Sequence, residues 1–385
     1  MARITRAESF VYRAPISTPI RTSFGTMPNR PSVLIRIEDA DGQFGWGEIW
    51  SNFPTIGAEY RARLFDAVIA PLLLEQGEAI DPRRFWQESD RALHLLALQT
   101  GEPGPLAGVL AAADIALHDL AARRAGTPLW RYLGGSDCAP VPVYASGINP
   151  GPGAVDTVQS CREKGFSAFK IKIGFGQASD EATLSAVAER LQPDERLMVD
   201  VNQGWDLSEA CRMSAVLQQF PLFWIEEPLP VDRPAQEWLL LKSVASAPLA
   251  GGENLRDQST FQQVLRDGYF SVLQPDMCKW GGMSGTLAVA RDVIDSGKMF
   301  CPHFLAGGVG LAASLQLMAA LGAPGFAELD VNPNPLREEL IPDVFQLKNG
   351  EMTLPAAPGL GFEPDIAPFR RFLTQHTESR CGDRA

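Results

Sequence analysis

The chain of 385 residues is long enough for two globular domains, and its 45% hydrophobic and 21% charged residues are ordinary for a folded protein. Its formal net charge of −12, without a basic stripe, argues against nucleic-acid binding, and its most apolar stretch (106–122) is interrupted by charged residues, so we expect no membrane span. The six cysteines show no CxxC spacing, which argues against a zinc site or a disulfide framework, and we expect a cytoplasmic protein.

The first 133 residues predict an α+β domain. Residues 2–13 alternate in polarity, and the runs 32–38 and 43–49 are joined by Asp39-Ala-Asp-Gly42, which predicts an antiparallel hairpin. Residues 59–132 have helical composition and end at a helix-stop signal. Two further segments, 18–27 and 50–54, predict loops that either cover a site or simply connect strands.

From Val141 onward, short apolar runs alternate with helical segments, and a polar residue recurs near the end of the runs at intervals of 23 to 28 residues. This alternation predicts a closed barrel of eight parallel strands, whose strand ends open to one common face. The final residues, 351–385, are expected to return to the first domain, with the last dozen frayed. The polar residues at the strand ends are Lys172, Asp200, Glu226, Glu253, Asp276, His303 and Glu328.

Three carboxylates end consecutive predicted strands, namely Asp200, Glu226 and Glu253. Side by side in a partly dry cavity, they would repel one another unless a cation neutralised them. Oxygen ligands without Cys or His favour Mg²⁺, which leaves open positions for substrate oxygens. The sequence therefore predicts a magnesium site. The alternative is that each carboxylate pairs separately with a lysine or arginine at the surface.

Two lysines and one histidine are the candidate acid/base groups. Lys170 and Lys172 project to the same face of one strand, where mutual repulsion would leave one of them neutral, unless the strand merely has a solvated face. His303 is expected beside Asp276, which would fix its tautomer and raise its basicity. Lys172 on the second strand and His303 on the seventh would flank a bound carbon from opposite sides.

The motifs around these residues resemble the enolase superfamily, mandelate racemase subgroup, over almost the whole chain. The resemblance implies an α/β fold, a modified TIM barrel of (β/α)7β type at 134–350 with an N-terminal capping domain at 1–133. It also implies a homo-oligomer. The matching motifs are Lys170-Ile-Lys172, Val199-Asp-Val-Asn202, Trp224-Ile-Glu-Glu-Pro228, Gly252-Glu-Asn254, Gln274-Pro-Asp276, Lys279-Trp-Gly-Gly282, His303, Glu328 and Asp114-Ile-Ala-Leu-His-Asp-Leu-Ala121. His118 stands where the family usually has Trp.

The resemblance also implies roles for individual residues. Asp276, where the muconate-lactonizing branch has a second catalytic lysine, indicates the racemase-type dyad with His303. The implied magnesium ligands, with Mn²⁺ as a substitute ion, are Asp200, Glu226 and Glu253. The implied catalytic groups are Lys172 with its partner Lys170, the pair Asp276 and His303, and Glu328 as a hydrogen-bond donor to the substrate carboxylate. The residues expected to support the site or contact the substrate are Asn202, Glu227, Arg21, Phe24 and Trp50.

The expected chemistry is removal of the proton alpha to a carboxylate, because Mg²⁺, Lys170 and Glu328 would stabilise the enediolate that forms. If His303 then expels a β-hydroxyl as water, the enzyme is a sugar-acid dehydratase, which we expect. Departure of a ring oxygen would make it a sugar-lactone cycloisomerase, and reprotonation a racemase or epimerase of a 2-hydroxy acid. The alternatives from other classes are a sugar-acid-binding protein without turnover and a Schiff-base aldolase at Lys172. The run Gly307-Gly-Val-Gly310 would suit either a bound phosphate or a tight turn.

Overall fold

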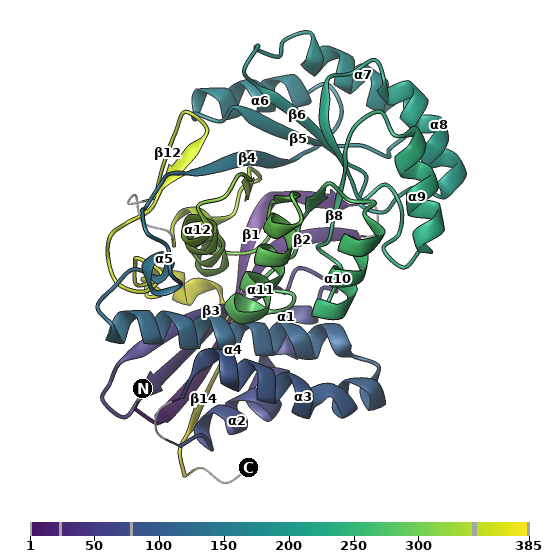
Figure 1. Ribbon diagram of the computed structural model, residues 1–385. Helices are drawn as coiled ribbons and strands as arrows, with labels where there is room; N and C mark the ends of the chain where they lie inside the picture. Colours follow the sequence, from purple (N-terminus) through teal and green to yellow (C-terminus); the bar gives the residue numbers. More distant parts are fainter. Residues whose placement is uncertain (1, 23–24, 78–79, 341–344, 383–385) are drawn as a thin grey trace.

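The computed structural model describes residues 2–22, 25–77, 80–340 and 345–382, and Figure 1 shows an N-terminal sheet with helices below a barrel. The sheet is antiparallel in the order β14-β1-β2-β3. Its strands are β1 (Ile4–Thr22), β2 (Gly25–Asp39), β3 (Phe44–Ile49) and β14 (Leu373–Arg380). The predicted hairpin is confirmed, because β2 pairs with β3 and the backbone N–H of Asp39 donates to the carbonyl of Gln43 at 2.8 Å across the turn.

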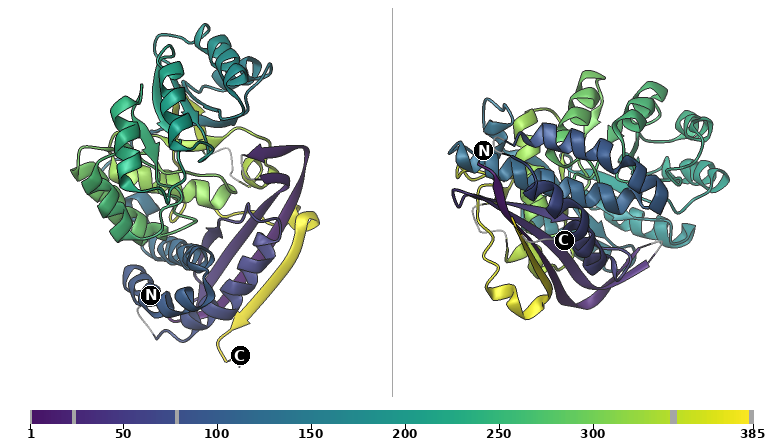
Figure 2. Two further views of the ribbon diagram at one scale, coloured as in Figure 1. Left: turned by 90° about the vertical axis from the view of Figure 1, so that its right-hand side faces the viewer. Right: turned by 90° about the horizontal axis from the view of Figure 1, so that it is seen from below.

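The predicted loop at 18–27 is wrong for residues 18–22, which belong to β1, and 25–27, which belong to β2; 23–24 lie outside the described residues. The two strands pair with Ile20 opposite Met27 and form a long two-stranded ribbon that Figure 2 shows reaching the barrel. Ile20 and Met27 are both buried. The segment forms paired strands because it has apolar side chains on one face, which pack against the rest of the protein. Arg21 lies on β1, but its side chain and the whole of Phe24 are outside the described residues.

Helix α4 (Pro103–Arg124) lies between the sheet and the barrel (Figure 1). Glycines on β3 allow its close approach, since a Cβ atom at Gly47 would lie 2.0 Å from the carbonyl oxygen of Ala112. α4 has the length and composition of a membrane-crossing helix, but 89% of its apolar window is buried inside the protein, as in a core helix. The other helical elements of this part are α1 (Gly57–Leu64), the π-helical turn η1 (Phe65–Ile69), α2 (Ala70–Leu74), α3 (Pro82–Thr100) and α5 (Leu129–Tyr132).

Within the described residues, parallel strands β4 to β11 alternate with helices α6 to α12, which confirms the expected (β/α)7β alternation. Each strand from β4 to β9 pairs with the next one along the chain, and β11 pairs with β4. The strands are β4 (Val141–Ile148), β5 (Ala168–Lys172), β6 (Arg196–Asp200), β7 (Leu222–Glu226), β8 (Leu249–Gly251), β9 (Val272–Leu273), β10 (Met299–Phe300) and β11 (Ala327–Asp330). The helices are α6 (Ala154–Glu163), α7 (Gln177–Ala188), α8 (Leu207–Leu217), α9 (Ala235–Val244), α10 (Gln258–Asp267), α11 (Gly282–Asp295) and α12 (Gly308–Leu321).

The C-terminal segment contacts both parts of the molecule. After α13 (Pro335–Glu338), β12 (Gln346–Lys348) and β13 (Glu351–Thr353) form a hairpin that pairs with the start of β4. After the 3-10 turn η2 (Pro368–Phe372), β14 pairs with β1 at the edge of the N-terminal sheet (Figure 2). The predicted fraying is therefore wrong for residues 374–380, which belong to β14, whereas 383–385 lie outside the described residues. The polar composition of β14 suits an exposed edge strand, and His376 stacks on Phe10 with ring centroids 4.4 Å apart.

Candidate active site

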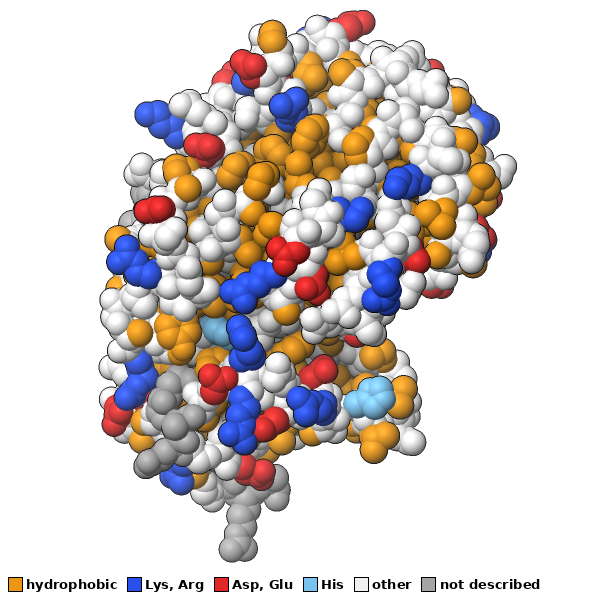
Figure 3. All heavy atoms as spheres, in the orientation of Figure 1, with side chains coloured by type: hydrophobic (Ala, Val, Ile, Leu, Met, Phe, Trp, Pro, Cys, Tyr) orange, Lys and Arg blue, Asp and Glu red, His pale blue; other side chains and the backbone are white. Residues whose placement is uncertain are grey.

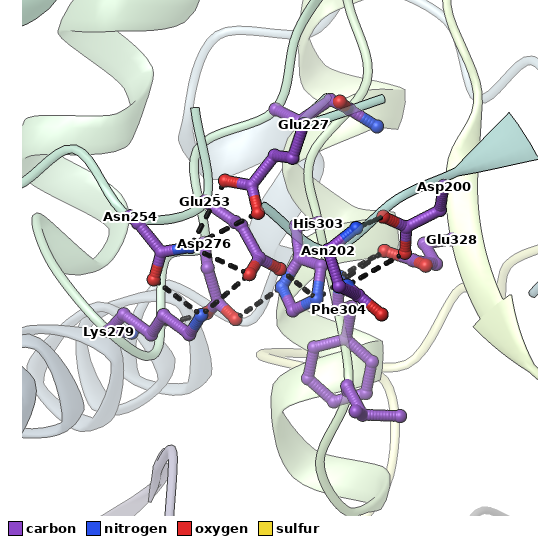
Figure 4. Close-up of polar contacts among 12 residues, drawn as sticks. Asp200, Asn202, Glu227, Glu253, Asn254, Asp276, Lys279, His303, Phe304 and Glu328 are labelled. Atoms are coloured by element: carbon purple, nitrogen blue, oxygen red, sulfur yellow. Dashed lines mark hydrogen bonds and ion pairs between the residues drawn. The ribbon is translucent and has the colours of Figure 1, made fainter. Parts of the chain in front are cut away.

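The polar residues at the strand ends converge at one mouth of the barrel, as the periodicity predicted. Strand register places Lys172 beside Asp200 and Asp200 beside Glu226, because the three end neighbouring parallel strands. Figure 4 shows the side chains of Glu253, Asp276 and Lys279 gathered on one side of the His303 imidazole, with Asp200 and Glu328 on its other side. All of these side chains are buried, so every charge among them needs a partner.

Lys170 is the deepest cation of the site. Its Nζ lies 2.5 Å from Glu226 Oε1 and 2.8 Å from Glu328 Oε1, and it donates to the Tyr144 hydroxyl at 3.4 Å. Burial lowers the pKa of Lys170, but Glu226 and Glu328 outweigh that effect and hold its pKa well above its usual value. The prediction that Lys172 lowers the pKa of Lys170 is therefore wrong. Lys170 stays charged because two carboxylates face it.

Glu226 and Glu328 respond differently to the same lysine. Burial raises the pKa of Glu226 to about 7 against the opposing effect of Lys170, whereas Lys170 and His303 overcome burial and lower the pKa of Glu328. Glu328 accepts hydrogen bonds from the Ser146 hydroxyl and, at 2.9 Å, from the backbone N–H of Phe304. In these contacts Glu328 is an acceptor, as an ionised carboxylate must be, and its expected role as a hydrogen-bond donor to the substrate carboxylate stays a prediction.

Lys172 lines the cavity at the mouth of the barrel. Its Nζ lies 3.5 Å from Asp200 Oδ2 and donates to Asn202 Oδ1. Asn202 in turn donates to both Asp200 oxygens, from its backbone at 2.8 Å and from Nδ2 at 2.9 Å. The backbone at Asn202 and Glu227 is left-handed, with φ of 49° and 39°. Such strained non-glycine conformations cluster at functional sites, where they aim side chains into the mouth.

His303 lies between two carboxylates. Its Nδ1 is 2.7 Å from Asp276 Oδ2 and its Nε2 is 2.5 Å from Glu253 Oε2. Burial lowers the pKa of His303, but Glu253, Glu328 and the hydrogen bond with Asp276 together raise it well above 6.5. The structure therefore brings together the predicted pair of Asp276 and His303 and holds the imidazole as a charged donor.

No role was predicted for Lys279, Tyr144 or Ser146, whereas Glu227 was expected to support the site. Lys279 Nζ lies 3.4 Å from Glu253 Oε1 and 4.6 Å from the centre of the Trp50 ring. Lys279 therefore connects the loop at 50–54 of the capping part to the carboxylate of Glu253. Glu227 accepts hydrogen bonds from Asn254 Nδ2 at 3.0 and 3.3 Å. Tyr144 and Ser146 alternate along β4, and this two-residue period was the signal that could have identified them as neighbours of the site.

The three proposed metal ligands fit a hard divalent cation by their chemistry and by their order on neighbouring strands. They supply carboxylate oxygens only, from the ends of neighbouring strands β6, β7 and the loop after β8. In the described part of the chain, no three such groups are gathered as a ready-made ligand set. Instead, each carboxylate contacts a cation of the site, which is Lys172 for Asp200, Lys170 for Glu226 and His303 for Glu253. The alternative of separate pairing with surface cations is therefore wrong, because these partners are buried in the same mouth.

The mouth encloses a cavity of about 40 Å³ whose roof comes from the capping part, through Ile20, Trp50 and Phe53. A larger hollow of about 860 Å³ lies elsewhere, between α3, α4 and the start of α10. Figure 3 shows that acidic and basic side chains are interspersed on the face it draws. We place the active site in the smaller cavity, because Lys172, His303 and the carboxylates of Asp200, Glu253 and Glu328 line it. Lys170, Glu226 and Asp276 contact these lining residues from behind.

The glycine run after β10 does not form a free phosphate site. The carboxylate of Glu48, from the capping sheet, accepts hydrogen bonds from the backbone N–H groups of Gly307 at 2.6 Å and Gly310 at 2.8 Å. A Cβ atom at Gly307 would lie 2.5 Å from Glu48 Oε1, which explains the glycine. Of the two alternatives for this run, the bound phosphate is therefore wrong, because a carboxylate of the protein already occupies the N-terminus of α12.

Comparison with known proteins agrees with this geometry. Residues 153–367 match the family described as Enolase C-terminal domain-like, and residues 6–134 match the Mandelate racemase / muconate lactonizing enzyme, N-terminal domain. D-galactarolactone cycloisomerase of Agrobacterium fabrum is 30% identical over 378 residues, covering 94% of this chain and 96% of that enzyme.

Solved structures extend the similarity to the whole fold. A crystal structure described as a mandelate racemase/muconate lactonizing enzyme from Bordetella bronchiseptica is 46% identical, with a TM-score of 0.90 and coverage of 96% of this chain and 99% of that one. L-talarate/galactarate dehydratase from Salmonella typhimurium, liganded with Mg and L-lyxarohydroxamate, is 27% identical, with a TM-score of 0.85 and coverage of 98% and 94%. The chain therefore belongs to the enolase superfamily, in its mandelate racemase and muconate lactonizing enzyme subgroup.

Proposed function

We propose that this protein removes the proton alpha to the carboxylate of a sugar acid and then eliminates the β-hydroxyl as water. The observation that carries the proposal is that Lys172 and His303 enter one cavity from strands on different sides of the barrel. Carboxylates that suit a magnesium ion lie between them. A dehydratase among the structural relatives, which is liganded with Mg and a sugar-acid hydroxamate, supports this assignment.

In the proposed mechanism, Asp200, Glu226 and Glu253 hold Mg²⁺, or Mn²⁺ in its place, which when bound supplies positive charge to the developing enediolate. Lys172 Nζ takes the alpha proton, while Lys170, held by Glu226 and Glu328, places a second positive charge next to the substrate carboxylate. Glu328 acts by positioning Lys170. His303, oriented by Asp276, donates the proton with which the β-oxygen leaves.

A second candidate is cycloisomerisation of a sugar lactone, in which His303 protonates a departing ring oxygen instead of a hydroxyl. The 30% identity with D-galactarolactone cycloisomerase over 94% of the chain supports this reaction as the second candidate. Both reactions share the first step, so they use the same residues of this site. They differ in the leaving oxygen, which only the substrate decides.

The proposal is tested by incubating the protein with Mg²⁺ and a panel of hexarates, hexonates and their lactones in D₂O. NMR follows the alpha proton and the products. We expect one class to exchange and to turn over, yielding a 2-keto-3-deoxy acid for dehydration. Lys172→Ala and His303→Asn should each reduce turnover by at least about 100-fold. The matched variants Lys164→Ala and His94→Asn, at exposed positions outside the cavity, should not.

Three outcomes would contradict the proposal. If no panel member exchanges its alpha proton, a sugar-acid or sugar-lactone substrate is wrong. If turnover survives in the Lys172→Ala and His303→Asn double variant, the assignment of the acid/base groups is wrong even though the substrate is right. A substrate that binds, seen as a rise in melting temperature, without exchange would identify a binding protein.

A further inference from the structure

Two hollows at the barrel mouth share one wall. The active-site cavity and a second, open hollow of about 290 Å³ at the ends of β4 and β11 are both lined by Gly147 and Asn332. Among the residues that the structure describes, no others are common to the two linings. The outer hollow also contains polar groups such as Asn149, and it lies beside the start of α6. Gly147 and Asn332 thus form the wall that separates the active-site cavity from the outer hollow.

This wall is held rigidly. Asn332 Nδ2 donates to the carbonyl of Gly147 at 3.0 Å, and so bridges β4 and β11, and it also donates to Asp330 Oδ1 at 2.8 Å. Gly147 has a φ of 79°, and a Cβ atom there would lie 2.3 Å from Asn332 Nδ2. A side chain at position 147 would therefore displace the amide that closes the wall.

The capping part fixes the wall from the other side. Asp330 Oδ2 lies 2.5 Å from Arg30 Nη2 and 3.1 Å from Arg337 Nη1. Arg30 comes from β2 and is only 1% exposed, and Arg337 Nη2 also donates to the carbonyl of Asn332 at 2.9 Å. These contacts orient the amide of Asn332 through Asp330, so its position depends on both parts of the molecule.

The inner cavity is too small to hold a whole sugar acid, so the wall formed by Gly147 and Asn332 limits the length of the substrate. About 40 Å³ has room for about three water molecules, at about 10–15 Å³ each, whereas a sugar acid of five or six carbons needs several times that space. The roof is formed by Ile20, Trp50 and Phe53, which offer few partners for hydroxyl groups. On the side of the wall, by contrast, both hydrogens of Asn332 Nδ2 are used by Gly147 and Asp330, which leaves the amide oxygen Oδ1 as the acceptor that the wall can offer to a hydroxyl group.

We propose that Asn332, with Gly147, determines the length of substrate that the site accepts, and that the distal hydroxylated carbons extend over this wall toward the outer hollow. The inference rests on the proposed function, since it assumes that the carboxylate end lies between Lys172 and His303. It assigns the substrate class as an acid with a polar tail. Asn332 acts here on specificity and takes no part in the proton transfers.

The test compares Asn332→Ala, and Asn332→Ser as a variant that keeps a hydrogen-bond donor, with the wild type on sugar acids of four to seven carbons. We expect both variants to improve kcat/KM for acids one or two carbons longer than the best wild-type substrate by about tenfold relative to that substrate. Gln87→Ala, which removes an exposed amide on α3, should leave the chain-length profile unchanged. Circular dichroism and melting temperature establish that each variant is folded.

A second measurement separates this inference from the proposed function. Unreactive hydroxamates of the same chain lengths are tested with Mg²⁺ for the rise in melting temperature that they cause. If the Asn332 variants shift this profile toward longer chains while no acid turns over, the length inference holds and the proposed reaction fails. If the acids turn over but neither profile changes in the Asn332 variants, the inference is overturned and the proposed function stands. Unchanged hydroxamate binding together with no turnover overturns both.

Discussion

Replacing Asp276 by asparagine tests whether its carboxylate prepares His303 for proton transfer. Asp276 Oδ1 accepts hydrogen bonds from the backbone N–H groups of Cys278 at 2.8 Å and Lys279 at 3.1 Å, so an oxygen should stay there and the new amide nitrogen should face His303 Nδ1. The 2.7 Å hydrogen bond between imidazolium and carboxylate is then lost. A charge-assisted bond contributes about 1.5–3 kcal/mol, which corresponds to about 10- to 150-fold in the rate of the step that uses His303.

The tautomer of the imidazole adds to this loss. An amide that donates to Nδ1 leaves the proton of neutral His303 on Nε2, so Nε2 can no longer accept a proton. Because the carboxylate hydrogen bond contributes to the raised pKa of His303, the pH-rate limb that reports this group should move to lower pH in the variant.

The assay is steady-state turnover between pH 5 and 10, together with alpha-proton exchange in D₂O, for Asp276→Asn and for Asp295→Asn as an exposed control at the end of α11. We expect the control to match the wild type and Asp276→Asn to fall toward the level of His303→Asn. Exchange through Lys172 should be affected less than turnover. A wild-type rate and an unmoved pH profile for Asp276→Asn would refute the reasoning, because His303 would then work without its carboxylate.

Two further predictions concern the capping contact and the metal. Glu48→Ala leaves the backbone N–H groups of Gly307 and Gly310 without acceptors, so urea denaturation should show a loss of about 2–6 kcal/mol, against at most about 0.5 kcal/mol for the exposed Glu88→Ala. Burial raises the pKa of Glu48 above 4.5, so the stability that its protonation contributes is fully present below about pH 4.5 and is lost as the pH rises through the folded pKa. The difference in the free energy of unfolding between wild type and Glu48→Ala should therefore become smaller as the pH rises. A difference that does not change with pH would contradict this expectation. Removal of metal by EDTA should abolish turnover, and added Mg²⁺ or Mn²⁺ should restore it and raise the melting temperature, but not in Glu226→Gln. An EDTA-resistant enzyme would instead point to Schiff-base chemistry at Lys172.

The sequence alone was sufficient for the barrel and for the location of the site. Strands and helices follow from local periodicity, and parallel strands all present their carboxyl ends to one face. The spacing of Lys172, Asp200, Glu226 and His303 therefore predicted that they meet, without knowledge of any individual contact. The same local rules identified the hairpin of β2 and β3, because its turn residues are adjacent in sequence.

Pairings between residues far apart in the sequence were decided only by the tertiary structure. Glu48 contacts Gly307 across 259 positions, and no local sequence pattern indicates that the backbone N–H groups of the glycine run already have a hydrogen-bond acceptor. Likewise, Glu328 is an acceptor and Lys170 stays charged because of which groups surround them in the folded chain. The pKa of a buried group depends on its nearest charges and on its desolvation, and both are properties of packing rather than of sequence spacing. For the same reason, the edge strand β14 and the wall at Asn332 became visible only once distant segments were placed side by side.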